Sequence, residues 1–464
     1  MTLPKNEGRN AASFRDPSGF VFHRDGVLYR QVNLRYRVHY EALMSSGLYR
    51  TLVGQGALVS HEEVGIAPFD ASAAFKVIRP AELPFISSPQ EWTFGELKDA
   101  ALLTLDIQRK ALEHGMVLKD ASAYNIQFSA CKPLFIDTLS FEVWKEGSPW
   151  VAYRQFCEHF LAPLALMAKV DAQLGVLQQT FIDGIPLGLA RSLLPWRTRF
   201  NPSLMIHVHL HAKSQERFGD RPTASRSSAM RRSALLGLTE SLTAAISKLT
   251  LELPEKGWSA YYDTCTYSGD EFRRKAEFIG KIVRLAKPAR VWDIGANTGA
   301  FSKIAAAEGI MTIAMDNDPL TMERLYRDCR SQHEARILPL VVDVANPTPG
   351  TGWENQERTP LLTRGPVDMV FALALIHHLA ITRNIPLQSI ARFFRQLCKH
   401  LVIEFVPKND PQVQRLLRSR EDIFDAYTRE EFERVFGECF VFSEILPVTD
   451  SGRVLYWMTG KAQG

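Results

Sequence analysis

A glycine-containing turn lies between a short apolar run and an apolar segment of helical pattern. The stretch reads Val291-Trp-Asp-Ile-Gly-Ala-Asn-Thr-Gly-Ala-Phe-Ser302, so that Asp293 stands before the first glycine. Gly295 and Gly299 can take positive φ angles and allow backbone to approach a ligand closely. Asn297 stands where a third glycine could occur, and asparagine tolerates this conformation better than most side chains. The stretch therefore predicts a ligand-binding loop between a strand and a helix.

Two further carboxylates end the apolar runs that follow this turn. Asp316 comes about 20 residues later, the spacing at which an acidic side chain accepts hydrogen bonds from ribose hydroxyls. Asp343 ends the next run, where an adenine amino group could donate to it. Because Asp293 would repel a diphosphate, a nicotinamide dinucleotide fits poorly. The three carboxylates favour a cofactor with a sulfonium and an ammonium group.

Candidate catalytic groups follow the next two apolar runs. His377 and His378 come directly after residues 369–375, and a histidine titrates near neutral pH and can accept a proton from a hydroxyl. Glu404 ends the run after that, and we expect it at the same sheet edge, where it could orient a histidine or bind substrate. The alternative is structural, with the histidines supporting the cleft and the glutamate capped or solvated.

Apolar runs alternate with helical patterns from about residue 253 to the C-terminus. This alternation predicts an α/β domain with a doubly wound parallel sheet. The predicted strands are 290–294, 311–315, 337–342, 368–373, 401–405, 440–446 and 453–459. The last two are expected to form an antiparallel hairpin around Thr449-Asp-Ser-Gly452. The first half is less regular, with short strand-like runs followed by helical patterns over 94–194, which predicts an α+β domain.

The C-terminal half resembles a known family over roughly residues 250–464. Its glycine turn, acidic strand ends and closing hairpin resemble class I S-adenosylmethionine-dependent methyltransferases with a Rossmann-like fold. Shorter motifs resemble the bacterial proteins similar to the nodulation methyltransferase NoeA, namely Trp258…Tyr261-Tyr262, Asp343-Val-Ala-Asn-Pro347, Gly352-Trp353, Ala374-Leu-Ile-His-His-Leu379 and Glu404-Phe-Val-Pro-Lys408.

This resemblance implies S-adenosyl-L-methionine as the cofactor. Asp293 and Gly295 would then lie under its methionine moiety, Asp316 at its ribose and Asp343 beside its adenine. Methyl transfer is an in-line displacement, so much of the catalysis can come from positioning. A general base is needed only for an acceptor that arrives protonated.

Two segments are candidates for substrate recognition. Tyr262 lies in the aromatic stretch 258–267, which could cover the pocket or pack in the core. The stretch 346–366 is long and rich in proline and glycine, and loops of that size in compact domains are usually functional. Its Trp353 and Arg358 are therefore candidate substrate contacts.

The N-terminal half resembles, more distantly, the catalytic and metal-binding loops of protein-kinase-like folds. Asp120, Asn125 five residues later, and Asp137 after a strand match their acceptor-orienting and Mg²⁺-binding residues. The sequence departs from that pattern, with Leu118 in place of histidine and no glycine-rich phosphate loop. A degenerate kinase-like scaffold, an active phosphotransferase and an unrelated helical domain remain open.

Composition bounds the remaining possibilities. The 464 residues predict an accessory domain over 1–210, a basic linker and helix over 211–250, and a methyltransferase domain over 251–464. A net charge of +4 is too small to argue by itself for a nucleic-acid or acidic-membrane partner, so nucleic acid is only a weak possibility. The six scattered cysteines argue against a zinc site or a disulfide framework. We expect a soluble cytoplasmic bacterial protein with no membrane partner and an undetermined oligomeric state.

The sequence favours O-methylation of a small molecule or a glycan, with the N-terminal domain aiding acceptor selection. A methyltransferase that acts on RNA or protein is the second hypothesis, because the segment 213–232 is basic and could contact phosphates. A solvated connector is the preferred interpretation of the same segment, because its low apolar content cannot offset the entropy cost of ordering it. A non-catalytic binding or regulatory protein is the third hypothesis.

Overall fold

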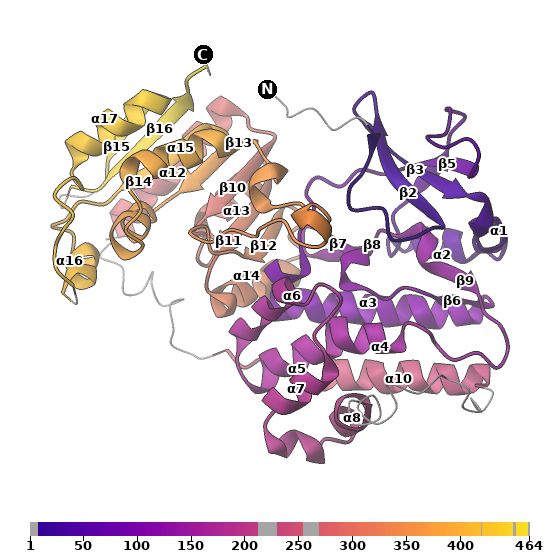
Figure 1. Cartoon of the computed structure of the whole chain (residues 1–464). Coiled ribbons are helices and arrows are strands. Elements are labelled where there is room, and N and C mark those ends of the chain that lie inside the picture. Colours follow the sequence, from indigo (N-terminus) through magenta and orange to yellow (C-terminus); the bar gives the residue numbers. More distant parts are fainter. Residues whose placement is uncertain (1–7, 212–229, 254–268, 419, 449–451, 463–464) are drawn as a thin grey trace. The chain divides into compact units, whose positions relative to one another are not determined.

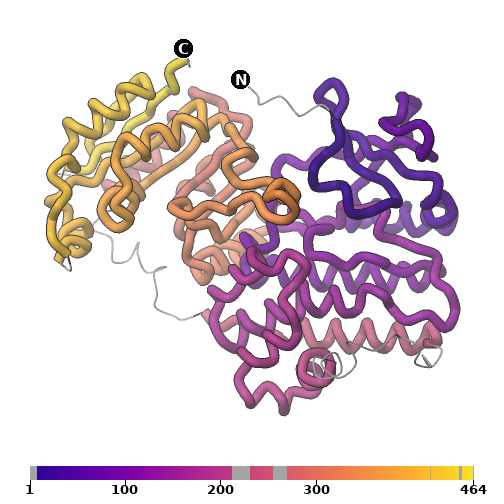
Figure 2. The backbone as a smooth tube through the Cα atoms, viewed as in Figure 1, coloured from indigo at the N-terminus to yellow at the C-terminus, as the bar shows by residue number. Residues whose placement is uncertain are grey.

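The computed structural model describes residues 8–211, 230–253, 269–418, 420–448 and 452–462 (Figure 1). Tyr262 and its aromatic neighbours, most of the basic segment 213–232, and the predicted turn at 449–451 lie outside the described residues. The chain forms two compact units (Figure 2). Unit 1 comprises Met1–Glu252 and Pro349–Thr359, and unit 2 comprises Leu253–Thr348 and Pro360–Gly464.

Unit 2 contains one seven-stranded sheet. Its strands are β10 (Arg290–Ile294), β11 (Met311–Asp316), β12 (Ile337–Val341), β13 (Val367–Ala372), β14 (Cys398–Phe405), β15 (Phe440–Pro447) and β16 (Val454–Gly460). The order is β12-β11-β10-β13-β14-β16-β15, in which the first five strands are parallel and β16 pairs antiparallel with both neighbours. This confirms the predicted doubly wound sheet with a closing hairpin. The order reverses between β10 and β13, which is where such sheets bind ligands.

Helices cover both faces of this sheet. They are α12 (Gly269–Ala286), α13 (Ala300–Ala307), α14 (Pro319–Ser331), α15 (Leu387–Leu397), α16 (Pro411–Leu417) and α17 (Arg429–Cys439), with short helical turns at Leu361–Arg364 and His378–Thr382. Side chains of a strand alternate between faces, so Leu455 of β16 joins the core beneath α12, while Tyr456 contacts Phe432 of α17.

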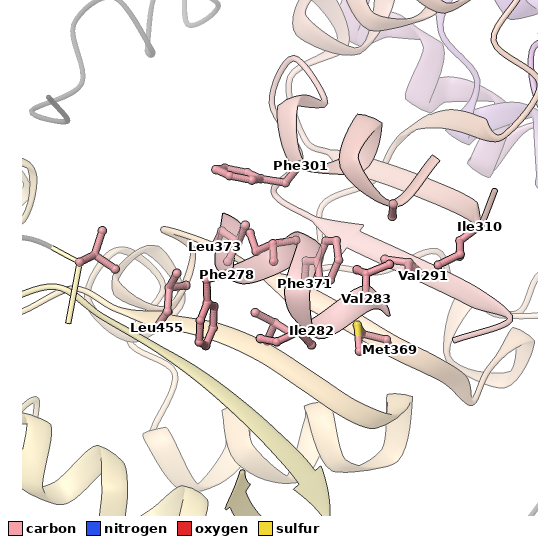
Figure 3. Packing of buried hydrophobic residues seen from close by; sticks show 14 residues of the cluster. Phe278, Ile282, Val283, Val291, Phe301, Ile310, Met369, Phe371, Leu373 and Leu455 are labelled. Atoms are coloured by element: carbon pink, nitrogen blue, oxygen red, sulfur yellow. The ribbon is translucent and has the colours of Figure 1, made fainter. Parts of the chain in front are cut away.

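The core on the α12 side fixes the ligand-binding edge. Phe278 and Ile282 of α12 pack with Phe301 of α13 and with Phe371 of β13 (Figure 3). All four are buried, and burying each such side chain stabilises the fold by about 1.5–3 kcal/mol. Because α12, α13 and the strands share one core, the turn after β10 is held on a rigid support.

Unit 1 is an α+β domain, as the sequence predicts. Its antiparallel sheet has the order β1-β2-β3-β5-β4, and two short ladders pair β6 with β9 and β7 with β8. The strands are β1 (Gly8–Arg9), β2 (Gly19–Arg24), β3 (Val27–Asn33), β4 (His61–Glu63), β5 (Ala74–Pro80), β6 (Met116–Leu118), β7 (Ile126–Ser129), β8 (Lys132–Phe135) and β9 (Phe141–Val143).

The helices of unit 1 are mostly short apart from two long ones that pack together. The long helices are α3 (Phe94–Glu113) and α10 (Arg232–Lys248). The others are α1 (Arg37–Ser45), α2 (Leu48–Gly54), α4 (Tyr153–Phe156), α5 (Ala162–Lys169), α6 (Leu177–Thr180), α7 (Leu187–Leu193) and α8 (Pro202–Leu204). Among the described residues, no helix has the length and apolar character needed to cross a bilayer.

Candidate functional site

The turn after β10 has the backbone that its residue types predict. Gly295, Asn297 and Gly299 have φ angles of 78°, 49° and 74°. A Cβ on Gly299 would lie 2.6 Å from the side chain of Leu325, so both the angle and the space require glycine there. The backbone amide of Gly295 donates to the carbonyl of Met315, which ties the turn to β11.

A cavity of about 410 Å³ opens at the carboxyl ends of β10, β11, β12 and β13. Its wall contains six of the residues that the sequence singled out, together with others that it did not. The predicted ones are Asp293, Gly295, Asn297, Asp316, Asp343 and His378; among the others are Lys275, Phe301, Asp318, Arg383 and Leu416. All lining residues belong to unit 2.

Asp293 forms the floor of the cavity. Its side chain accepts a 2.6 Å hydrogen bond from the Ser302 hydroxyl, and the residue is only 2% exposed. Burial, helped by the nearby charge of Asp316, outweighs the hydrogen bond from Ser302 and raises the pKa of Asp293 to about 6. A carboxylate in this environment is stabilised by a bound cation.

Asp316 at the end of β11 lies against the glycine turn. The backbone amides of Asn297 and Asp318 donate to its two carboxylate oxygens over 3.0 and 3.1 Å. Burial raises the pKa of Asp316 despite these bonds. Asp343 is also in the wall, but its carboxylate accepts from Arg383 over 2.8 Å. The negative charge that Asp293, Asp316 and Asp318 give the wall favours a cationic ligand.

The two adjacent histidines have different surroundings. His378 begins the helical turn His378–Thr382 and lines the cavity, and burial lowers its pKa, so that it is neutral at pH 7. His377 is 0% exposed, and neither of its ring nitrogens has a hydrogen-bond partner. Burial, followed by the charges of His378 and Arg453, lowers the pKa of His377 well below its ordinary value. Of the two histidines, only His378 can present its imidazole as a base to a ligand in the cavity.

Glu404 is at the sheet edge that the sequence predicts, but it is 0% exposed and behind the cavity wall. Its carboxylate accepts from the Lys275 ammonium over 2.7 Å and from the Ala374 amide over 2.9 Å. Its other oxygen is 3.8 Å from Arg453, which donates twice to Asp410 over 2.6 and 3.0 Å. Glu404 therefore lies between the buried cations of Lys275 and Arg453. It also holds the backbone amide of Ala374, whose φ is 48°.

Lys275 and Arg453 were not singled out by the sequence. Lys275 belongs to α12, which precedes the first strand, and Arg453 directly precedes β16. The one signal for Lys275 is its position on the apolar face of an amphipathic helix, between Phe272 and Phe278, where lysine is rare. No local pattern marks Arg453.

Trp353 and Arg358 are in unit 1 and are not among the residues that line the cavity. They belong to a compact hairpin in which Thr351 bridges Arg358. Glu357 of this hairpin is buried and accepts two hydrogen bonds from Arg15, over 2.5 and 2.8 Å. Arg358 lies 3.8 Å above the ring of Tyr124, and Trp353 is 69% exposed.

The three kinase-like residues lie close together in unit 1. Burial, and then the charge of Asp137, raise the pKa of Asp120, and Asn125 forms a hydrogen bond with it. Asp137 is bound by the Arg30 guanidinium and the Ser140 hydroxyl, each over 2.5 Å. Burial alone would raise the pKa of Asp137, but these two groups outweigh it and lower the pKa. Among the described residues, no group of three or more aspartate, glutamate, histidine or cysteine side chains is arranged to hold a metal ion.

Comparison with known proteins gives one extensive match. The chain is 35% identical over 443 residues to the nodulation protein NoeA of Rhizobium meliloti (strain 1021). The aligned region covers 93% of this chain and 92% of NoeA. No protein-family model matches the chain.

Two solved structures show weaker likenesses. The N-methyltransferase NodS from Bradyrhizobium japonicum WM9 is 12% identical over 42% of this chain and 99% of NodS, with a TM-score of 0.31. The bifunctional kinase-methyltransferase WbdD is 12% identical, with a TM-score of 0.31, and covers 44% of this chain. The aligned region spans 42% of WbdD, less than half of that protein. Likenesses at this level leave the acceptor open.

The match to NoeA extends through both units. It agrees with the sequence motifs that resemble NoeA-like proteins and with the doubly wound sheet of unit 2. The chain therefore belongs to the NoeA family.

Proposed function

We propose that the chain transfers a methyl group from S-adenosylmethionine to a hydroxyl of a small molecule or a glycan. The observation that carries this proposal is the acidic cavity at the carboxyl ends of β10 and β11, with His378 in its wall. Unit 2 supplies the cofactor site, and residues 251–464 are the proposed catalytic domain.

The cofactor would be held by groups from three strand ends. Asp316 would accept from the two ribose hydroxyls, and the turn from Gly295 to Gly299 would face the methionine half. Asp293 would face its ammonium group, since a buried carboxylate with a raised pKa gains most from a cation. Asp343, held by Arg383, would lie beside the adenine. A sulfonium ligand suits this negative wall, whereas a diphosphate does not.

Methyl transfer to a hydroxyl needs alignment and a place for one proton. The acceptor oxygen attacks the methyl carbon in line with the carbon–sulfur bond, which breaks as the new bond forms, and the hydroxyl proton must leave. A neutral imidazole at His378 can take this proton at pH 7. His377 has no access to the cavity and would act by packing alone.

Replacing His378 by alanine is expected to lower kcat by about 10²–10⁴-fold, the usual contribution of a general base. The affinity for S-adenosylmethionine should stay within about two-fold. Since burial holds the His378 pKa below its ordinary 6.5, the wild-type rate should fall only on acidification below pH 6.5. At saturating S-adenosylmethionine, where the titration of Asp293 does not limit cofactor binding, the fall of the rate at acidic pH should disappear in the variant.

The measurement is transfer of labelled methyl into bacterial extract, fractionated by size and treated with nuclease or protease. His333→Asn, which changes an exposed histidine of unit 2, is the matched control. Label in the small-molecule or glycan fraction supports the proposal. Label that nuclease or protease releases from the large fraction would instead favour an RNA or protein acceptor.

We also propose that unit 1 selects the acceptor, through the predicted accessory region 1–210 and the hairpin 349–359. Helix α10 of the predicted connector 211–250 packs on α3 and belongs to unit 1. The hairpin with Arg358 supports this, because its guanidinium is held over Tyr124 beside the kinase-like residues. Asp137 is already bound by Arg30 and Ser140, which favours a degenerate scaffold over a phosphotransferase.

Arg358→Ala is expected to raise the acceptor KM about ten-fold, the effect of one lost charge-assisted hydrogen bond, and to leave cofactor affinity unchanged. The measurement is initial-rate kinetics with the acceptor found above, beside cofactor titration by calorimetry. Arg364→Ala, in unit 2, is the control. An unchanged acceptor KM would remove the hairpin from substrate recognition.

A further inference from the structure

Two aromatic side chains are exposed at the turn between α7 and α8 (Figure 1). Trp196 and Phe200 are 66% and 75% exposed, and their rings meet edge to face with centroids 5.5 Å apart. Leu193, the last residue of α7, is 43% exposed. Single exposed apolar side chains are common on proteins, but several at one place indicate an interaction surface. We call residues 196–200 the aromatic turn.

The inner side of the aromatic turn is fixed to unit 1. Thr198 is only 7% exposed, and its hydroxyl donates to the carbonyl of Pro195 over 2.7 Å. The same hydroxyl is 2.9 Å from Nε2 of His209, which is 5% exposed. Because Thr198 is held on the inside, the outward position of Trp196 and Phe200 is set by a defined helical turn.

The charged side chains from residue 184 to residue 211 are three arginines, with no aspartate or glutamate among them. Arg197 and Arg199 lie in the aromatic turn, are exposed, and form no ion pair within the described part of the chain. Arg191 of α7 and Arg199 are close enough to His209 for their charges to lower its pKa, after the larger effect of burial. The turn therefore presents aromatic rings together with positive charge.

We propose that the aromatic turn binds the surface of an anionic lipid bilayer. Aromatic rings, tryptophan above all, partition to the boundary between headgroups and acyl chains, because one side of that boundary is apolar and the other is wet. Arginines next to them attract the anionic headgroups, and each strengthens binding by about five-fold. Rings that are two-thirds or more exposed protrude from the protein, so they can enter a soft boundary without a preformed pocket.

This proposal goes beyond the proposed function, because binding to a bilayer requires neither the cofactor nor the methyl acceptor. It also differs from the expectation of no membrane partner, which rests on the lack of an apolar run long enough to span a bilayer. A protein that binds at the bilayer surface needs no such run.

The test is co-sedimentation of the full-length chain with vesicles of phosphatidylcholine, with and without about one-third phosphatidylglycerol. The wild type should bind the anionic vesicles at least about ten-fold more tightly than the neutral ones, and about 0.5 M salt should remove most of this preference. Trp196→Ala and Phe200→Ala should each weaken binding to the anionic vesicles about ten-fold, because each removes apolar area that leaves water. The double variant Arg197→Gln/Arg199→Gln should weaken it about 25-fold.

Matched controls come from elsewhere in unit 1. Trp353→Ala removes an indole that is 69% exposed, and Arg35→Gln/Arg50→Gln removes two exposed arginines and the same net charge. All of these variants change exposed side chains, so their unfolding midpoints should match the wild type. Both controls should keep the wild-type affinity for anionic vesicles within about two-fold.

A wild type that binds neither kind of vesicle would overturn the proposal. Equal losses in the turn variants and in the controls would also overturn it, because binding would then follow total charge and apolar area and not this turn. Sedimentation velocity without lipid tests another occupant of the surface. Self-association that Trp196→Ala abolishes, without vesicle binding by the wild type, would overturn the proposal and assign the turn to contact with a second copy of the chain.

Discussion

Asp316→Ala is expected to weaken S-adenosylmethionine binding by roughly 10²–10⁴-fold, because two hydrogen bonds to a charged group contribute about 1.5–3 kcal/mol each. The substitution also removes the acceptor for the Asn297 amide, so the glycine turn loses a support that the cofactor needs. No catalysis at ordinary cofactor concentrations should remain. The measurement is calorimetric titration of the cofactor into the full-length variant.

The matched control is Asp328→Ala. Asp328 is an exposed carboxylate on α14, the helix that follows Asp316, so its removal changes the charge by the same amount away from the cavity. Its cofactor affinity should stay within about two-fold of the wild type, since a surface charge contributes little. Wild-type affinity in Asp316→Ala would mean that the nucleoside binds elsewhere.

Arg453→Met is expected to destabilise unit 2 by about 3–5 kcal/mol, the usual cost of removing one partner from a buried ion pair. Asp410 would remain 0% exposed without the two hydrogen bonds that it accepts from the guanidinium. Glu404 would keep its bond from Lys275, so the loss should be concentrated at Asp410 and the start of α16. The measurement is hydrogen exchange of β14 and β16 peptides across a urea series, which reports unit 2 by itself.

A second variant separates the charge from the packing. Adding Asp410→Asn to Arg453→Met removes the unpaired carboxylate while keeping its shape, and it should recover at least about half of the lost stability. If the double variant is no more stable than the single one, lost packing of the arginine and not its charge is responsible.

The sheet of unit 2 and the backbone of its ligand-binding turn could be predicted from local sequence patterns. Strands such as Arg290–Ile294 are short apolar runs buried on both faces, a pattern that leaves few alternatives in an α/β chain. The carboxylates at their ends are adjacent because parallel strands end at the same edge. The positive φ of Asn297 follows from local sterics alone.

Only the tertiary structure decided which of two adjacent histidines faces the cavity. His377 and His378 are identical in type, and neighbouring residues of a helical turn point about 100° apart. The direction of that turn is set by its packing against α15 and α16. Local pattern therefore predicts a histidine at this edge, and the fold selects His378.

The buried charges were also decided by tertiary structure. Lys275, Glu404, Asp410 and Arg453 come from a helix before the first strand, a strand end, a helix start and the closing hairpin. The helical position of Lys275 and the strand-end position of Glu404 are local signals in the sequence, but nothing local shows that the four charges are buried together. Their meeting depends on contacts between residues 43 to 129 positions apart, which the folded sheet brings together. The sequence therefore predicts the edge of the sheet at which the ligand binds, whereas the burial of the Lys275 ammonium near that edge depends on the tertiary structure.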